Sequence, residues 1–283
     1  TWIRVDGQIY IISSSESNTN YKSIKDSSFP SLSSLIVINM TEDRFGNIWM
    51  ATTEGLFKLA LTADNEVKNV EHLSDHIDFQ HKSIKLIRYV YSDPMYDYMW
   101  IGTDVNGLIR IKNEPDKSIA ESEIDQFLNN VQQFNSISSN FVTSIIRLPN
   151  GELWIGTERG GINLMIDDIS EAPTFVAYSE KDGLSNNVVK NILYDHDYNL
   201  WIPTNKGLNK FDRENKIFIT YGKQDGLPFE DFVYPAVKTG NGKLLFSGYN
   251  GIFFFDPHKV RNEEVLPGIR FGEVRLFNKV IQP

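Results

Sequence analysis

The chain has 283 residues, of which 41% are hydrophobic and 12% aromatic, so it is long and apolar enough to bury a large core. Its net charge of −9 argues against a nucleic-acid or anionic-membrane partner, and its lack of cysteine excludes disulfides, thiolate catalysis and cysteine-based zinc sites. The N-terminus has no signal-peptide pattern, and no stretch approaches the ~18 consecutive apolar residues of a membrane helix.

One phrase recurs along the chain, and each copy opens on a bulky apolar residue. The copies WMATTEGL, WIGTDVNGL, WIGTERGGI, WIPTNKGL and LFSGYNGI begin 51, 54, 47 and 44 positions apart, at Trp49, Trp100, Trp154, Trp201 and Leu245. We call these five residues the anchors. An eroded copy begins at Trp2. A period of about 40 to 50 residues is typical of a stacked or circular array of identical units.

Short apolar segments surround each anchor in chain order. In the third repeat they are 141–148, the anchor segment, 162–166 and 174–178. They run for four to eight residues, are rich in β-branched and aromatic residues, and end at Gly, Asn or Asp, which indicates strands. Each repeat is therefore predicted to be a four-stranded meander. The fold class is all-β: a β-propeller fragment of about five to six four-stranded blades from a seven-bladed ring, followed by the first strand of a β-sandwich.

Three local expectations follow from this arrangement. The tryptophan anchors should be buried in the second strand of each blade. Gly102 and Gly156, inside strands, indicate close approach of another backbone or a Trp ring. The glycines that open the next strand should adopt positive φ, namely Gly55, Gly107, Gly161, Gly207 and Gly251.

One connection is unusually long and carries a different period. Residues 118–134 place apolar side chains at the spacing of an amphipathic helix, which predicts a helix packed as a surface excursion between blades. A lid over a ligand is the alternative.

Both ends of the chain interrupt the repeat. The first copy has no inner strand before Trp2, and the last has no fourth strand before Pro257, so we expect a piece of a longer protein. Residues 1–260 are assigned to propeller blades. Residues 261–283 are assigned to a linker and the first strand of a following β domain.

Two stretches carry a family resemblance. YSEKDGLSNNVVKNILYDHDYNLWIPTNKGLNKFD (178–212) and SISSNFVTSIIRLPNGELWIGTERGGINL (136–164) resemble the repeat of the two-component regulator propellers. FFFDPHKV, leading into LPGIRFGEVRLFNKV, resembles the junction to the immunoglobulin-like (Y_Y_Y) domain that follows those propellers. The sequence departs from the repeat at Leu245, which replaces Trp, and at Pro203, which replaces a small residue.

The resemblance implies a biological setting. It implies the periplasmic sensor region of an inner-membrane hybrid two-component histidine kinase that responds to glycan breakdown products. The implied partners are an oligosaccharide or other small ligand and a second copy of the intact sensor. It implies no nucleic acid, and membrane contact only through segments outside this chain. The sensor module itself would be non-catalytic, with the kinase elsewhere.

Motifs for catalysis and metal binding are lacking. No nucleophile elbow, dinucleotide loop, Walker loop or zinc-protease motif occurs, and we expect no cofactor, no metal and no catalytic residue. Asp195, Asp197 and Asn199 mimic the start of a calcium loop, but Leu200 stands where glycine is required, so they are interpreted as a turn. A histidine group in an inter-blade connection is interpreted as a solvated loop: His72, His76 and His81, with Asp75 and Asp78.

The candidate ligand site is the rim on which second-to-third-strand turns and connections into the inner strands meet. Its polar and aromatic side chains suit a sugar: amides and carboxylates pair with hydroxyls, Tyr stacks, and Arg159 would hold an acidic group. Ordinary turn formation is the alternative for each residue. The candidates are Glu54, Asp104, Asn106, Glu158, Arg159, Asn187, Asn205, Lys206, Glu230 and Tyr249, accompanied by Asn140, Asn186, Asp231 and Asn250.

Three functional hypotheses remain open from the sequence. The first is a ligand-sensing module of a glycan-responsive kinase. The second is a scaffold for protein–protein interaction, which an exposed apolar patch on the rim would favour. The third is a propeller lyase or glycosidase, for which Glu158 and Glu230 are the nominated carboxylate pair.

Overall fold

The structure is a computed structural model of residues 1–283. It describes residues 36–62, 67–73, 86–115 and 117–260 in full, and it assigns strands within 2–23, 78–83 and 274–281. No helix in the described part of the chain is long and apolar enough to cross a membrane.

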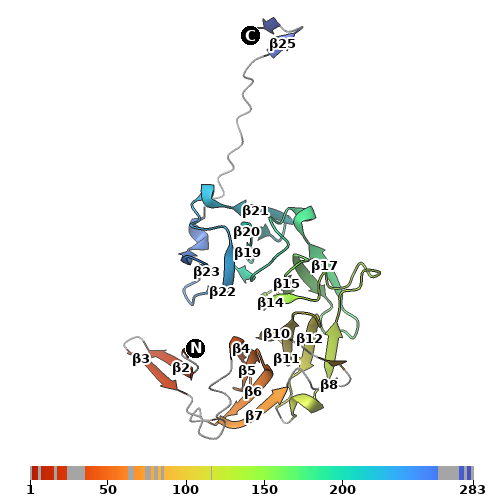
Figure 1. The fold of residues 1–283 in the computed structure, drawn as a ribbon, viewed down its shortest axis with the longest axis vertical. Coiled ribbons are helices and arrows are strands. Elements are labelled where there is room, and N and C mark those ends of the chain that lie inside the picture. Colours follow the sequence, from red (N-terminus) through yellow and green to blue (C-terminus); the bar gives the residue numbers. More distant parts are fainter. Residues whose placement is uncertain are drawn as a thin grey trace.

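Four antiparallel sheets have the predicted four-stranded meander, and Figure 1 shows them arranged around a common centre with the first strand of each nearest to it. The first sheet contains β4 (Val37–Glu42), β5 (Ile48–Thr52), β6 (Gly55–Leu61) and β7 (Val67–Leu73). The second contains β10 (Ile87–Ser92), β11 (Tyr98–Thr103), β12 (Leu108–Lys112) and β13 (Ile124–Phe127). The third contains β14 (Val142–Arg147), β15 (Leu153–Thr157), β16 (Ile162–Ile166) and β17 (Thr174–Tyr178). The fourth contains β18 (Leu193–Tyr194), β19 (Leu200–Thr204), β20 (Gly207–Asp212) and β21 (Ile217–Tyr221).

The remaining strands form smaller sheets. A fifth blade sheet has three strands, β22 (Phe232–Lys238), β23 (Leu244–Gly248) and β24 (Gly251–Phe255). The eroded copy at the N-terminus also gives three strands, β1 (Trp2–Val5), β2 (Gln8–Ser15) and β3 (Asn18–Ser23). Two hairpins are β8 (Asp78–Phe79) with β9 (Lys82–Ser83), and β25 (Val274–Leu276) with β26 (Lys279–Ile281). The all-β propeller fold is therefore confirmed, whereas the domain boundary at 260/261 stays a prediction because residues 261–273 lie outside the described residues.

The tryptophan anchors form the core between neighbouring sheets. Each anchor tryptophan lies near the start of the second strand of its sheet and is at most 1% exposed: Trp49 in β5, Trp100 in β11, Trp154 in β15 and Trp201 in β19. Their strands are buried on both faces, because each sheet packs against the next and leaves no face to solvent. The expectation of four buried, equivalent tryptophans is confirmed.

A carboxylate in the turn before β5, β11 and β19 holds the anchor indole. Asp195 Oδ1 accepts from the backbone N–H groups of Asp197 and Asn199, and its Oδ2 accepts from Trp201 Nε1 at 3.0 Å. Asp43 and Asp93 repeat this arrangement with Trp49 and Trp100. Since the buried indole N–H needs an acceptor, one carboxylate satisfies both the turn and the core.

The turns between second and third strands share a Thr–Gly bond. Thr157 Oγ1 donates to the Gly161 carbonyl at 2.9 Å, and the equivalent bond recurs at Thr52, Thr103 and Thr204. All five glycines expected to adopt positive φ do so, with values from 72° to 149°. Gly102 also meets its expectation, because an added Cβ would stand 3.1 Å from the Val142 carbonyl of the next sheet.

The predicted helix at 118–134 is wrong. The segment contains the 3-10 turn η2 (Ile119–Glu121) and then β13, which pairs with β12 as the fourth strand of its sheet. Ile119 and Ile124 are buried, whereas Val131 and Phe134 are exposed. Strand pairing at the open edge of β12 satisfies backbone groups that a surface helix would have left unpaired, and it therefore overrides the helical period.

A buried ion pair joins the second and third sheets. The Arg147 guanidinium donates to Asp93 Oδ2 at 2.6 Å, with both side chains at most 1% exposed, and it also pairs with Asp168. Asp93 thus serves its own turn, the Trp100 indole and a cation of the neighbouring sheet.

Candidate functional site

The inner strands of the sheets are irregular at one equivalent position. Register shifts occur between Val37 and Asn39, Ile87 and Tyr89, Val142 and Ser144, and Val233 and Ala236. The inner segment of the fourth sheet also departs from regular pairing, between an isolated bridge at Val189 and the start of β18 at Leu193. Such β-bulges turn a side chain away from the regular pleat. The residues in these irregularities are Ile38, Arg88, Thr143, Tyr234 with Pro235, and Lys190; we call them the bulge residues.

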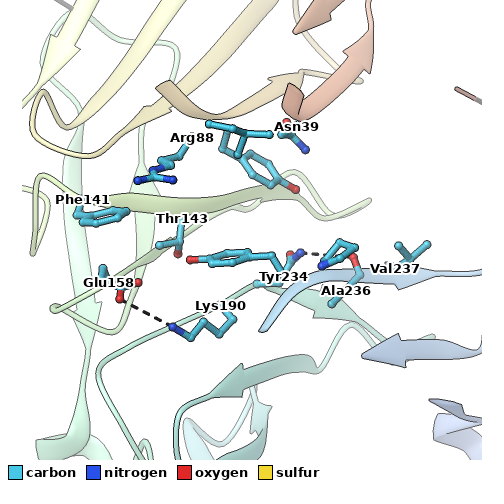
Figure 2. Close-up of a pocket in the computed structure, with 13 residues that line it drawn as sticks. Asn39, Arg88, Phe141, Thr143, Glu158, Lys190, Tyr234, Ala236 and Val237 are labelled. Atoms are coloured by element: carbon cyan, nitrogen blue, oxygen red, sulfur yellow. Dashed lines mark hydrogen bonds and ion pairs between the residues drawn. The ribbon is translucent and has the colours of Figure 1, made fainter. Parts of the chain in front are cut away.

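All of the bulge residues line one cavity of about 370 Å³, which we call the channel cavity. Figure 2 shows side chains from several sheets converging on it. Every described blade sheet therefore contributes an inner-strand residue to its wall. Its lining is completed by Asn39, Tyr89, Phe141, Glu158, Asn191, Ala236 and Val237.

An ion pair fixes Arg88 beside the cavity. Arg88 Nε and Nη2 donate to Asp104 Oδ1 and Oδ2 at 2.5 and 2.8 Å, a two-bond arrangement that orients the guanidinium. The hydrogen bond to Asp104 raises the pKa of Arg88. The guanidinium carbon also lies 5.7 Å from the centre of the Phe141 ring.

A second cation and carboxylate face each other without touching. Lys190 Nζ lies 3.8 Å from Glu158 Oε1, with side chains 14% and 26% exposed, and Figure 2 shows the two groups directed at each other. This distance exceeds that of a hydrogen bond. Within the described residues, neither side chain has a hydrogen-bond partner. The pair therefore leaves donors and acceptors available inside the cavity.

Tyr234 belongs to β22, and its side chain extends across the cavity. Its hydroxyl points toward Thr143 in Figure 2, without the geometry of a hydrogen bond, so that the buried Thr143 Oγ1 has no hydrogen-bond partner in the part of the chain that the structure describes. Burial, and next the Glu158 carboxylate, raise the pKa of Tyr234. Burial also raises the pKa of Tyr89 to about 12. Both phenols are therefore uncharged near neutral pH.

The structure brings two of the sequence-predicted site residues to the cavity. Glu158 lines it, and Asp104 holds Arg88 at its edge. Three others instead accept hydrogen bonds from backbone N–H groups within connections: Asn140 from Asn129, Asn187 from Glu180, and Glu230 from Lys223. Asn106, although not exposed, is outside the lining, and Asn186 bonds within its own connection to Glu180. The exposed remainder, also outside the lining, comprises Glu54, Arg159, Asn205, Lys206, Asp231, Tyr249 and Asn250.

One group of side chains has the proximity of a metal site. Ligand atoms of Asp195, His196 and Asp197 lie within 4.8 Å of one another. Both Asp195 oxygens already accept hydrogen bonds from the turn or from Trp201, as the turn interpretation requires. Of the inter-blade histidines, His72 stacks on Phe57, whereas His76 and His81 lie outside the described residues.

Sequence reasoning missed Arg88, Thr143, Lys190 and Tyr234. A positional signal was nevertheless available. Ile38, Thr143, Lys190 and Tyr234 each precede the anchor of their own repeat by eleven positions, and Arg88 precedes Trp100 by twelve. These positions alternate between apolar, polar and charged residues inside otherwise apolar strands, which is the pattern expected where a scaffold is constant and a contact surface varies.

Comparison with known proteins agrees with the repeat pattern. The family model of the two component regulator propeller matches residues 136–159, which contain β14 and β15. Histidine kinase P4 of Formosa agariphila is 27% identical over 230 aligned residues, which cover 65% of this chain and 16% of that protein.

Solved structures share the fold at low identity. PorZ, a surface component of the type-IX secretion system of Porphyromonas gingivalis, aligns with a TM-score of 0.63 at 14% identity, over 90% of this chain and 38% of that one. The virginiamycin B lyase of Staphylococcus aureus aligns with a TM-score of 0.51 at 15% identity, over 78% of this chain and 69% of that one. The extracellular domain of a hybrid two component system from B. thetaiotaomicron aligns with a TM-score of 0.48 at 21% identity, over 90% of this chain and 38% of that one.

The chain thus spans 16% of the length of its curated relative and 38% of the PorZ chain. At these identities PorZ and the virginiamycin B lyase show a shared fold alone. Residues 136–159 match the model of the two component regulator propeller and include β14 and β15 of the third of the four four-stranded blade sheets.

Proposed function

We propose that this chain is the extracytoplasmic ligand-sensing module of a hybrid two-component sensor histidine kinase that responds to glycan breakdown products. The channel cavity carries the proposal, because it gathers a guanidinium, an ammonium, a carboxylate, hydroxyls and aromatic rings from four sheets, with Ile38 and Asn39 of a fifth. Support comes from the matched repeat and from the similarity to a histidine kinase. The setting proposed is the periplasmic face of the inner membrane.

Sensing would follow from the position of the cavity. A ligand there contacts residues of β4 and β22, from the first and last of the five blade sheets, as well as the sheets between them. It therefore favours one relative arrangement of the blades, and it can shift that equilibrium only by the difference in its affinity for the two arrangements. In a homodimer of the intact sensor, this shift would be passed to kinase domains elsewhere in the protein.

A non-catalytic role fits the carboxylates better than hydrolysis does. A glycosidase needs two carboxyl groups flanking the scissile bond. Glu158 lines the channel cavity, but Glu230 is engaged with the Lys223 backbone N–H in a connection and is not part of the lining. The nominated pair is therefore not assembled. The fold shared with virginiamycin B lyase does not by itself imply its activity.

A protein-interaction scaffold is the second candidate, and exposed apolar side chains favour it. Val131 and Phe134 are 88% and 102% exposed, and Ile252 and Phe254 on β24 are 66% and 60% exposed. Scattered exposed apolar residues are normal, but grouped ones mark contact surfaces.

The first experiment is a thermal-shift screen of the full chain against neutral and acidic oligosaccharides from plant and host glycans. A ligand at 100 times its Kd adds about 2.7 kcal/mol of stability, which is readily measured. Stabilisation by one glycan class supports the sensor. If no glycan stabilises the protein, the sensor hypothesis fails and the scaffold gains support.

The second experiment locates the site. With the best glycan, Tyr234→Ala and Lys190→Met should weaken binding, whereas rim variants at Arg159, Lys206 and Tyr249 should not if the channel cavity is the site. The opposite result would place the ligand on the rim that the sequence suggested.

A further inference from the structure

We infer that the channel cavity selects a neutral saccharide unit over one that carries a carboxylate or sulfate. This inference deepens the proposed function and rests on it. Three features of the cavity support it: the charge balance, the unpaired hydrogen-bonding groups and the aromatic surface.

The charges at the cavity cancel. Arg88 and Lys190 supply two positive charges, and Asp104 and Glu158 supply two negative charges. The Arg88 guanidinium already donates two hydrogen bonds to Asp104. An anionic ligand would have to compete for that guanidinium or approach Lys190 beside Glu158, where like charges repel at short range. A cationic ligand meets the reverse obstacle. A neutral ligand meets neither.

The unpaired groups are those that sugar hydroxyls satisfy. Lys190 Nζ can only donate and ionised Glu158 can only accept, whereas a hydroxyl does both. Because Nζ and Oε1 are only 3.8 Å apart, one hydroxyl that approaches the pair from the side could accept from Lys190 and donate to Glu158. Because Lys190 and Glu158 are partly exposed and have no hydrogen-bond partners among the described residues, the cavity can receive hydrogen bonds from a ligand.

Aromatic surface and volume complete the match. Tyr234 is 47% exposed although its hydroxyl lies in the cavity, so part of its ring is free to contact the apolar C–H face of a sugar ring. Phe141 lines the same cavity. The volume of about 370 Å³ lies at the small end of ligand pockets and suits a mono- to disaccharide end rather than a long chain.

Calorimetric titration of the full chain with matched disaccharides tests this inference. Each pair consists of a neutral disaccharide and the counterpart in which one ring carries a uronic carboxylate. We expect the neutral member to bind at least about tenfold more tightly, which corresponds to about 1.4 kcal/mol.

Charge variants should change the preference for the neutral over the acidic disaccharide, which a merely structural role would leave unchanged. Glu158→Gln leaves the cavity with an excess positive charge, so neutral binding should weaken while the preference over the acidic counterpart shrinks or reverses. Lys190→Met should weaken neutral binding and leave the acidic ligand excluded. Matched controls are Glu214→Gln and Lys68→Met, whose exposed side chains lie on an outer turn and an outer strand.

The outcomes separate this inference from the proposed function. Tighter binding of acidic members, weakened by the cavity variants, would overturn neutral selectivity and keep the sensor. Neutral binding that is unaffected by changes at Glu158 and Lys190 would overturn the assignment to this cavity. Lack of binding by any saccharide would overturn both. Thermal melting of each variant shows whether the fold is retained.

Discussion

Replacement of Asp93 by alanine should be among the most destabilising single changes in the described blades. The substitution removes the acceptor of the Trp100 indole N–H, the acceptor for the turn at Met95 and Tyr96, and the main counter-ion of buried Arg147. Breaking a buried ion pair from one side costs about 3–5 kcal/mol. Because Asp168 still pairs with Arg147, we expect the lower end, about 3 kcal/mol, for this part alone.

The repeat supplies an internal control. Asp195 makes the equivalent bonds to its turn and to Trp201 but has no arginine partner within the described residues. Asp195→Ala should therefore cost only the unsatisfied donors, about 1–3 kcal/mol. The double variant Asp93→Ala with Arg147→Met removes both charges and should recover part of the loss.

Urea unfolding of the three variants and the wild type measures these differences through the transition midpoint. Equal losses for Asp93→Ala and Asp195→Ala would show that the Arg147 pair contributes nothing. A double variant less stable than Asp93→Ala would refute the argument from an uncompensated buried cation.

Three further predictions concern packing and ionisation. Trp201→Ala should lower the free energy of unfolding, measured in urea, by about 3–5 kcal/mol, because the indole packs on the rings of Tyr221 and Phe255 with centroid distances of 5.6 and 4.9 Å. A loss below about 1 kcal/mol would contradict its core role. Gly156→Ala should cost about 1–3 kcal/mol by the same assay, because its Cβ would stand 2.8 Å from Val189 Cγ1, whereas Gly240→Ala, with nothing within 4 Å, should be nearly neutral. The pKa of Tyr89 is raised to about 12, so its contribution to stability is fully present below pH about 10, the ordinary tyrosine value, and is lost as pH rises toward 12. Tyr89→Phe should reduce this alkaline loss of stability in pH-dependent melting. An unchanged profile would argue against a buried Tyr89 phenol.

The architecture was predictable from the sequence because its causes are local and repeated. A buried tryptophan recurs in four units, a turn glycine and a strand-length apolar run recur in all five, and strand pairing within a unit spans few residues. The helix predicted at 118–134 failed because its period was judged in isolation. Only the unpaired edge of β12 shows that Ile124–Phe127 must extend.

The candidate site was less predictable because it arises between units. Glu158 and Asp104 stood out as polar turn residues, but Lys190 and Arg88 looked like ordinary charges within apolar segments. Arg88 reaches the cavity through a one-residue register shift, and Lys190 lies in a segment that departs from regular pairing; no local propensity encodes either feature. Asp104 lies in a turn of the same sheet as Arg88, whereas Glu158 lies in the sheet next to Lys190 and is brought close by the packing of the two sheets.

The bulge residues also have a consequence for how such a protein can change. A bulge residue is excluded from the ladder of its own strand, so its side chain can be exchanged with little effect on the pairing that holds the blade. Five repeats each offer one such freely exchangeable position, and all five face the same space. Ligand preference can therefore be rewritten one repeat at a time, and new combinations can arise by shuffling or duplicating whole repeats, while the tryptophan-anchored frame stays the same.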